Sequence, residues 1–91
     1  EPAAARDRSE AERLVGVAGG QLVRGDVASA VASLQRARDA DPTYAPIYRH
    51  LGLAYERMQR DAAARDAYRR YLQLAPNAPD AERVRARIAA L

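Results

Sequence analysis

Apolar side chains recur along most of the chain with the spacing of an amphipathic α-helix. The stretch HLGLAYERM, residues 50–58, illustrates this pattern: its apolar positions follow i, i+3, i+4, i+7 and share one helix face, at Leu51, Ala54, Tyr55 and Met58. The same reasoning predicts five helices, at about residues 10–24, 26–40, 44–58, 60–74 and from Asn77 to the end. Residues 1–8 are expected to form a linker or to extend the first helix. The chain is therefore predicted to be all-α.

Gly52 lies in the middle of this apolar face. A glycine inside a helix costs about 1 kcal/mol relative to alanine. Either the segment is a turn rather than a helix, or a neighbouring element packs so closely that no side chain fits. The pattern in the rest of the chain distinguishes these two interpretations.

Prolines and helix-capping residue types recur along the chain with a fixed period. The period is 34 residues. It separates Pro42 from Pro76, and each proline ends a similar stretch, RARDADP and YLQLAP. Ser9, Thr43 and Asn77 are separated by the same interval, and all three types can accept a hydrogen bond from the first turn of a helix. We therefore expect these residues to cap the first, third and fifth helices.

Residues near the expected helix starts support these boundaries. Ser9 and Glu12 have the spacing of a capping box, and Asp26 is the expected cap of the second helix. Pro46 suits the first turn of the third helix because its φ is fixed at a helical value. Asp80 suits the first turn of the fifth helix because its negative charge lies at the positive end of the helix dipole.

The second 34-residue window resembles a tetratricopeptide repeat. The motif of that family is a helix-turn-helix pattern, W-x2-L-G-x2-Y…A-x3-F…P. The matching residues are Tyr48, Leu51, Gly52, Tyr55, Ala64, Tyr68 and Pro76. The first window is a weaker copy, in which Ala18 replaces the glycine and Gln21 replaces the tyrosine. The resemblance covers residues 9–91.

This resemblance implies antiparallel helix pairs stacked as a short right-handed α-solenoid. The expected single domain, residues 1–91, contains one repeat at 9–44, a second at 45–78 and a capping helix at 79–91. The resemblance also implies that Gly52 and Ala64 lie where two helices cross, as do Ala18 and Ala30. Gly52 is then a close-packing residue inside a helix.

Three further glycines, Gly16, Gly19 and Gly20, fall in the first helix. We expect them to weaken the middle of this helix, which would be either closely packed or slightly irregular there. They do not form a phosphate loop, because no Lys-Ser/Thr pair follows them and no strand precedes them.

Composition and charge exclude or disfavour several classes of partner and site. All 15 cationic residues are Arg, acidic residues are mixed among them, and the net charge is +3. A nucleic-acid-binding surface is usually more lopsided, so nucleic acid is a disfavoured partner. No apolar run is long enough to span a membrane. The absence of Cys excludes disulfides and thiolate sites and leaves the compartment open. The style of the sequence suggests a soluble bacterial scaffold of the cytoplasm or periplasm.

The sequence offers little catalytic chemistry. His50 is the only histidine, and without a second His or a Cys it favours a structural or surface role over metal binding. Ser29 and Ser33 lie one turn apart and are expected to face water, and no Ser-His-acid set can be assembled. The acids sit beside arginines, as on a solvated surface, with Asp61–Arg65 and Asp66–Arg70 as expected i,i+4 pairs. We predict no catalytic, cofactor or metal site.

Stacked helix pairs form a concave groove lined by the first helix of each pair. The groove residues on which the resemblance places most weight are Arg49, His50, Leu53, Arg57, Arg83 and Arg87. It also places further residues in the groove. They are Pro46, Glu56, Asp80 and Val84, and from the first repeat Glu12, Val15, Gly16, Gly19, Leu22 and Val23. Because Arg presents a planar fork to carboxylates, an acidic or C-terminal peptide with an apolar anchor would suit this groove. The alternative is that these arginines form only a solvated face.

The predicted function is a non-catalytic protein–protein interaction scaffold. The Lys and Asn of the carboxylate clamp in chaperone-binding relatives are replaced by Val15 and Gly19, so a chaperone-tail adaptor is not predicted. The alternative is a structural or self-associating segment of a larger repeat protein, with RNA binding through the Arg face less favoured. Four apolar residues could pack against preceding helices or a second copy of the chain: Leu14, Val15, Leu22 and Val23.

Overall fold

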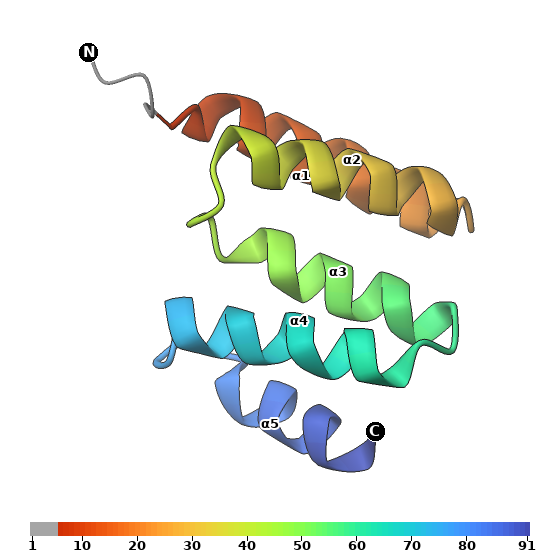
Figure 1. Cartoon of the computed structure of the whole chain (residues 1–91), viewed down its shortest axis with the longest axis vertical. Helices are drawn as coiled ribbons and strands as arrows, with labels where there is room; N and C mark the ends of the chain where they lie inside the picture. Colours follow the sequence, from red (N-terminus) through yellow and green to blue (C-terminus); the bar gives the residue numbers. More distant parts are fainter. Residues whose placement is uncertain (1–5) are drawn as a thin grey trace.

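A computed structural model describes residues 6–91 and places them in five helices (Figure 1). Their bounds are Arg8–Val23 for α1, Val27–Ala40 for α2, Pro46–Arg57 for α3, Asp61–Leu74 for α4 and Ala81–Ala90 for α5. No strand occurs in the described part of the chain, which confirms the all-α prediction. Residues 1–5 of the predicted linker or extension lie outside the described residues, and Arg8 already belongs to α1.

The helices stack in chain order along the long axis of the molecule (Figure 1). Helix α1 packs on α2 and α3 packs on α4 as two antiparallel pairs, α3 also contacts both helices of the first pair, and α5 covers α4. The result is an elongated body of 43 × 30 × 21 Å, a short helical repeat solenoid.

The two helix pairs make the same turn. Gly25 follows α1 with a φ of 81°, and Gln59 follows α3 at the corresponding place of the second repeat, with a φ of 58°. In each turn the next amide bonds back to the preceding helix, from Asp26 N to Gln21 O at 2.8 Å and from Arg60 N to Tyr55 O at 2.9 Å. These two bonds are also one repeat apart. The backbone conformation of the turn is therefore the same in both repeats. The second repeat adopts it with a glutamine, where the first has a glycine.

The start of α1 differs from the prediction. Its cap is Asp7, whose carboxylate accepts a hydrogen bond from Glu10 N at 2.9 Å, while Ser9 lies inside the helix. The predicted capping box of Ser9 and Glu12 is therefore wrong. The Asp7 carboxylate takes the role from just before the helix, with the added benefit of negative charge at the helix N-terminus. The prediction for α2 is confirmed, since Asp26 accepts from Ser29 N.

Thr43 and Asn77 do not cap helices. The Thr43 amide and hydroxyl both donate to Asp41, at 3.0 and 2.7 Å, and α3 begins at Pro46 without a side-chain cap. Proline lacks an N–H, so one of the unpaired amides of a helix start is absent there. Helix α5 begins only at Ala81, beyond the reach of a cap at Asn77. Such a cap would need the N–H of residue 79 or 80, and Pro79 has none.

The core runs along the contacts between successive helices. Its largest fully buried apolar side chains are Leu34, Ile47 and Leu51. Ala18 and Ala30 are both fully buried, as expected for small residues at a helix crossing. Helix α1 runs through its glycines as one continuous helix, and nothing lies within 4 Å of a Cβ placed on Gly16. The expected close packing at Gly16 is therefore wrong.

Some surface expectations also fail. Asp66 pairs with Arg69 at 3.8 Å rather than with Arg70, and Arg65 donates to the Leu91 carbonyl at 2.7 Å rather than to Asp61. Ser33 is buried and donates to Gln21 Oε1 at 2.8 Å, and Ser29 is half-buried. Ser33 therefore lies in the contact between α1 and α2 instead of facing water, whereas Ser29 remains partly exposed.

The apolar residues invoked for packing on further helices are mostly used within the chain. Leu14, Val15 and Leu22 are buried between the helices, and only Val23, 87% exposed, faces outward. The observed α1 surface therefore gives little support to self-association through this apolar set. Among the helices of residues 6–91, none combines the length and apolarity needed to cross a membrane.

Candidate functional site

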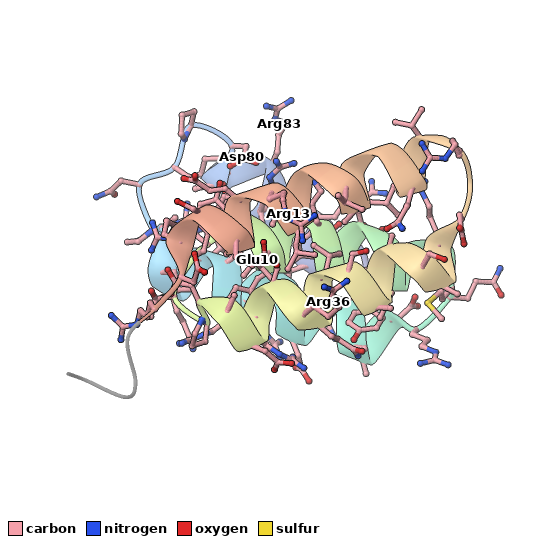
Figure 2. The ribbon with its side chains drawn as sticks, turned by 90° about the horizontal axis from the view of Figure 1, so that it is seen from above. Glu10, Arg13, Arg36, Asp80 and Arg83 are labelled. Atoms are coloured by element: carbon pink, nitrogen blue, oxygen red, sulfur yellow. The ribbon has the colours of Figure 1, made fainter. Side chains whose placement is uncertain are left out.

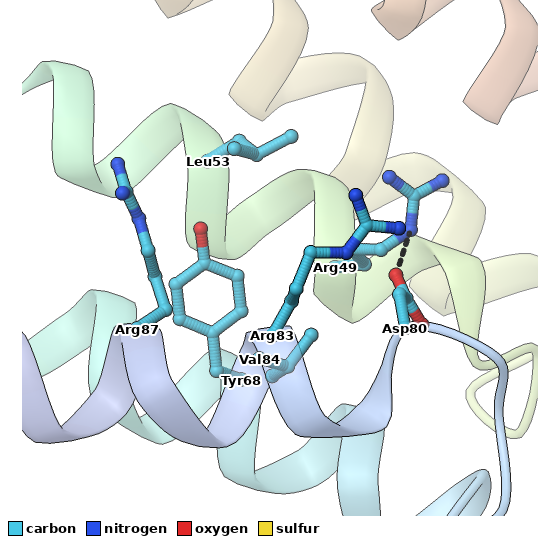
Figure 3. Close-up of a pocket in the computed structure, with 7 residues that line it drawn as sticks. All are labelled: Arg49, Leu53, Tyr68, Asp80, Arg83, Val84 and Arg87. Carbon is cyan, nitrogen blue, oxygen red and sulfur yellow. Dashed lines mark ion pairs between the residues drawn. The ribbon is translucent and has the colours of Figure 1, made fainter.

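A cavity of about 220 Å³ lies between α3 and α5, with α4 behind it (Figure 3). Its lining residues are Arg49 and Leu53 of α3, Tyr68 of α4, Asp80 just before α5, and Arg83, Val84 and Arg87 of α5. Arg49 and Arg83 are separated by one repeat period, which places them at corresponding positions of α3 and α5. Four of the six predicted groove residues thus line one cavity: Arg49, Leu53, Arg83 and Arg87.

The floor of the cavity is apolar and rigid. Tyr68 and Val84 are buried, and Leu53 is half-buried beside them. The Tyr68 ring covers Gly52, and its hydroxyl donates to Glu56 Oε1. Burial, together with this hydrogen bond to a carboxylate, raises the pKa of Tyr68 well above its ordinary value. Tyr68 is therefore a neutral donor that fixes both the floor and the position of Glu56.

Glu56 holds one of the cavity arginines. Arg87 Nε lies 2.9 Å from Glu56 Oε1, and the Glu56 side chain is only 15% exposed. Burial favours the neutral form of Glu56, but the hydrogen bonds from Arg87 and Tyr68 outweigh it and lower the pKa. The carboxylate is ionised at neutral pH, and Arg87 already has an internal partner.

Asp80 holds a second arginine at the other end of the cavity. Arg49 Nε lies 3.7 Å from Asp80 Oδ2, and Tyr71 of α4 donates its hydroxyl to Asp80 Oδ1 at 2.6 Å. Asp80 therefore fastens the start of α5 to both α3 and α4. The same contacts leave Arg49 at the rim of the cavity, next to Arg83 (Figure 3).

Arg83 is the uncommitted guanidinium of this site. Within residues 6–91 it has neither an ion pair nor a hydrogen bond. It projects outward from α5 (Figure 2) and is exposed. A carboxylate arriving from solvent would meet Arg83 without displacing an internal partner.

Two predicted groove residues lie outside the cavity and join α1 to α3 instead. His50 Nδ1 is 2.9 Å from the Pro46 carbonyl, and its Nε2 lies against Gly19 of α1. Arg57 Nη1 donates to the Leu22 carbonyl at 2.7 Å, at the end of α1. Their places on the repeat are as expected, but contacts with the first helix pair occupy them.

Sequence reasoning missed part of the lining. Tyr68 was matched to the repeat motif but was not placed in the groove, yet its ring reaches from α4 between α3 and α5 to form the floor (Figure 3). The pairs Arg87–Glu56 and Arg49–Asp80 each join residues 31 apart, about one helical turn short of the repeat. A spacing of one repeat minus about one helical turn is the signal that could have suggested them.

The imidazole of His50 should titrate below the usual His pKa. Burial at the α1–α3 contact lowers the pKa of His50, the Pro46 carbonyl acts in the opposite direction, and the charge of Arg49 lowers it further. Because the unfolded chain then binds the proton more readily, His50 makes the fold less stable as pH falls below about 6.5. An NMR titration of the only His in the chain measures this directly. The same midpoint in the native state and in urea would contradict the buried placement.

Comparison with known proteins identifies the repeat. The family model described as Tetratricopeptide repeat matches residues 22–88, more than half of the chain. The match begins at the end of α1 and includes all of α2, α3 and α4 and most of α5. No curated protein and no solved structure matches the chain significantly.

Proposed function

Because the chain belongs to the tetratricopeptide repeat family, whose members are generally protein–protein interaction modules, we propose that it is a non-catalytic scaffold that binds a protein segment between α3 and α5. The segment proposed is acidic and presents one apolar side chain. The observation that carries this proposal is the exposed, uncommitted Arg83 beside an apolar floor in the described structure.

The size of the cavity supports a side chain rather than a whole small molecule as its occupant. Ligand pockets usually measure about 300–1,000 Å³, whereas this cavity measures about 220 Å³. A leucine-sized side chain on Leu53 and Val84 would exclude water from apolar surface. The rest of the segment would then continue along the groove past the arginines.

The charges of the rim support an acidic segment. Arg87 is hydrogen-bonded to Glu56 and Arg49 forms a longer ion pair with Asp80, so both guanidiniums already lie at the rim where a carboxylate would meet them. Arg83 adds a full positive charge without an internal competitor. Arg forms bidentate bonds with carboxylates, which favours aspartate or glutamate next to the apolar anchor.

Replacing Arg83 with glutamate should weaken binding of an acidic peptide by about 10-fold. The peptide is a fluorescein-labelled Gly-Glu-Glu-Leu-Glu-Glu-Gly, and its affinity is measured by fluorescence anisotropy. The expected cause is the loss of the attractive charge at the cavity rim and its replacement by a repulsive one. Arg85→Glu is the matched control, because Arg85 is exposed on the same helix and lies outside the cavity. It should bind the peptide nearly as well as the wild type.

Two outcomes would contradict the groove. Equal weakening by Arg83→Glu and Arg85→Glu would mean that net charge alone attracts the peptide. Undiminished binding after the leucine is replaced by alanine would mean that the apolar floor plays no part. Loss of affinity with both Arg83→Glu and the leucine replacement, but not with Arg85→Glu, supports the proposed site.

A further inference from the structure

A second cavity opens on a different side of the fold, and the proposed function does not use it. Its volume is about 310 Å³. It is lined by Arg38 of α2, by Tyr48, Leu51 and Tyr55 of α3, and by Ala63, Asp66, Ala67 and Arg70 of α4. It shares no residue with the cavity between α3 and α5. We call it the α2–α4 slot.

The slot exists because α2 and α4 do not contact each other. Helix α3 lies between them and packs against both (Figure 1). Ala63 and Ala67 are lining residues from α4, and their short side chains leave space above α3. The rings of Tyr48 and Tyr55 and the side chain of Leu51 form the floor. The repeat geometry therefore produces an aromatic floor between two walls.

The walls carry positive charge with little internal compensation. Arg38 is exposed and has no ion pair or hydrogen bond with any residue from 6 to 91. The Arg70 guanidinium lies over the Tyr48 ring, 5.7 Å from its centroid, and donates only to the exposed Gln73 side chain at 3.3 Å. Two guanidiniums on opposite walls thus remain open to a ligand.

The slot also contains one acceptor. Asp66 pairs with Arg69 at 3.8 Å, and the two side chains are 80% and 60% exposed. An exposed pair at this distance is weak and leaves the carboxylate free to accept another hydrogen bond. An N–H donor entering between the arginines would meet the Asp66 carboxylate.

We propose that the α2–α4 slot is a second docking surface, and that its occupant is an acidic protein segment presenting an aromatic side chain. An aromatic ring fits a floor of tyrosines and leucine and gains from ring–ring contact. Flanking glutamates or aspartates would reach Arg38 on one wall and Arg70 on the other. A tryptophan N–H or a backbone N–H would donate to Asp66. The chain could then hold one segment on each of two faces at once.

The same charges argue against a nucleic-acid occupant. Only two open guanidiniums line the slot. Affinity for nucleic acid rests on many phosphate contacts made together. The net charge of +3 over the whole chain is small for such a role. A single acidic segment needs only the two charges present.

The test uses the peptide Gly-Ser-Glu-Glu-Trp-Glu-Glu-Gly-Ser. The chain has no Trp, so emission excited at the red edge reports on the peptide alone. Saturable binding with a Kd below about 1 mM is expected. The double variant Arg38→Glu, Arg70→Glu should weaken it by at least about 10-fold, by two charge reversals at the walls.

Two further variants separate the slot from general effects. Ala63→Leu fills the slot without changing charge and should also weaken binding of the tryptophan peptide. Arg36→Glu is the matched charge control. Arg36 is exposed on α2 near Glu10 and Arg13 (Figure 2), and it lies outside the slot. Its reversal should leave the affinity nearly unchanged, and far-ultraviolet circular dichroism should show that every variant remains helical.

Three results would overturn the proposal. The first is the absence of saturable binding up to about 1 mM peptide. The second is a loss of affinity with Arg83→Glu that the slot variants do not share, because the peptide would then bind between α3 and α5. The third is tighter binding of a ten-nucleotide oligo-dT than of the peptide, lost in the Arg38→Glu, Arg70→Glu variant. The first groove is tested separately, with the leucine peptide and the Arg85→Glu control.

Discussion

Gly52→Ala should lower the free energy of unfolding by about 2 kcal/mol, although alanine is the better helix former. A Cβ on Gly52 would overlap the Tyr68 ring, only 2.6 Å from its Cζ. Tyr68 is 2% exposed and its hydroxyl is bonded to Glu56, so the ring has little room to move. Overpacking of this kind costs about 1–3 kcal/mol or more and exceeds the helix-propensity gain of about 1 kcal/mol. Urea unfolding followed by circular dichroism measures the change.

Gly16→Ala is the matched control for this prediction. Gly16 also lies within a helix, but nothing lies within 4 Å of a Cβ placed on it, and the residue is exposed. The same substitution should therefore stabilise the protein by up to about 1 kcal/mol. If the two substitutions change the free energy of unfolding in opposite directions, close packing at Gly52 outweighs the helix propensity of alanine. If Gly52→Ala also stabilised the protein, the Tyr68 ring would have to occupy another position, and the floor of the groove would be different.

The sequence was most informative where the repeat sets the position of a residue. The apolar pattern predicted the all-α fold and the number of helices, and the resemblance to the repeat family placed Gly52 at a close crossing. The resemblance also assigned Arg49 and Arg83 to the same groove. These features depend on the backbone path and on which face a side chain occupies. Both recur with the period, so pattern alone is sufficient to predict them.

Predictions that depend on competition between partners were less successful. Thr43 has the residue type of a cap, but the buried Asp41 accepts both of its donors. His50 and Arg57 also make contacts that their register did not predict, with the carbonyls of Pro46 and Leu22. Such outcomes depend on distances between groups that are far apart in the sequence. Residue type and period do not contain those distances.

The cavities themselves follow from side-chain lengths at several helices together. The α2–α4 slot depends on Ala63 and Ala67 being short while Tyr48 and Tyr55 are long. Each of these residues is an ordinary member of a helical repeat when considered singly. Only their arrangement in space shows that the space above α3 stays open.

Asp41→Ala should lower the free energy of unfolding at neutral pH by about 3 kcal/mol. Asp41 is 1% exposed and joins three segments of the chain. It accepts from the Thr43 amide and hydroxyl and from Arg8 Nε at 2.6 Å, at the first turn of α1. Arg8 also stacks over the Tyr44 ring, 4.9 Å from its centroid. Removing the carboxylate leaves the Thr43 and Arg8 donors without this partner and releases the start of α1 from the α2–α3 loop.

The pH dependence of stability gives an independent measure of the same contact. Burial favours the neutral form of Asp41, but the hydrogen bonds from Thr43 and Arg8 outweigh it and lower the pKa to about 2, from 3.8 in the unfolded chain. The ionised form therefore stabilises the fold fully above about pH 4, and this contribution is lost as pH falls through about 2. The shift corresponds to about 2 kcal/mol.

Comparison with Asp41→Asn isolates this contribution, because Glu10 and Glu56 also titrate with lowered pKa and affect both proteins equally. Unfolding free energies would be measured in urea from about pH 6 to about pH 2. The wild type should lose about 2 kcal/mol more than Asp41→Asn over this range, so that the two stabilities converge in acid. Parallel curves would show that the Asp41 carboxylate gains nothing from Arg8 and Thr43 on folding. The junction between the two repeats would then rest on the apolar contacts of α3 with α1 and α2 and on the hydrogen bond from Arg57 to the Leu22 carbonyl.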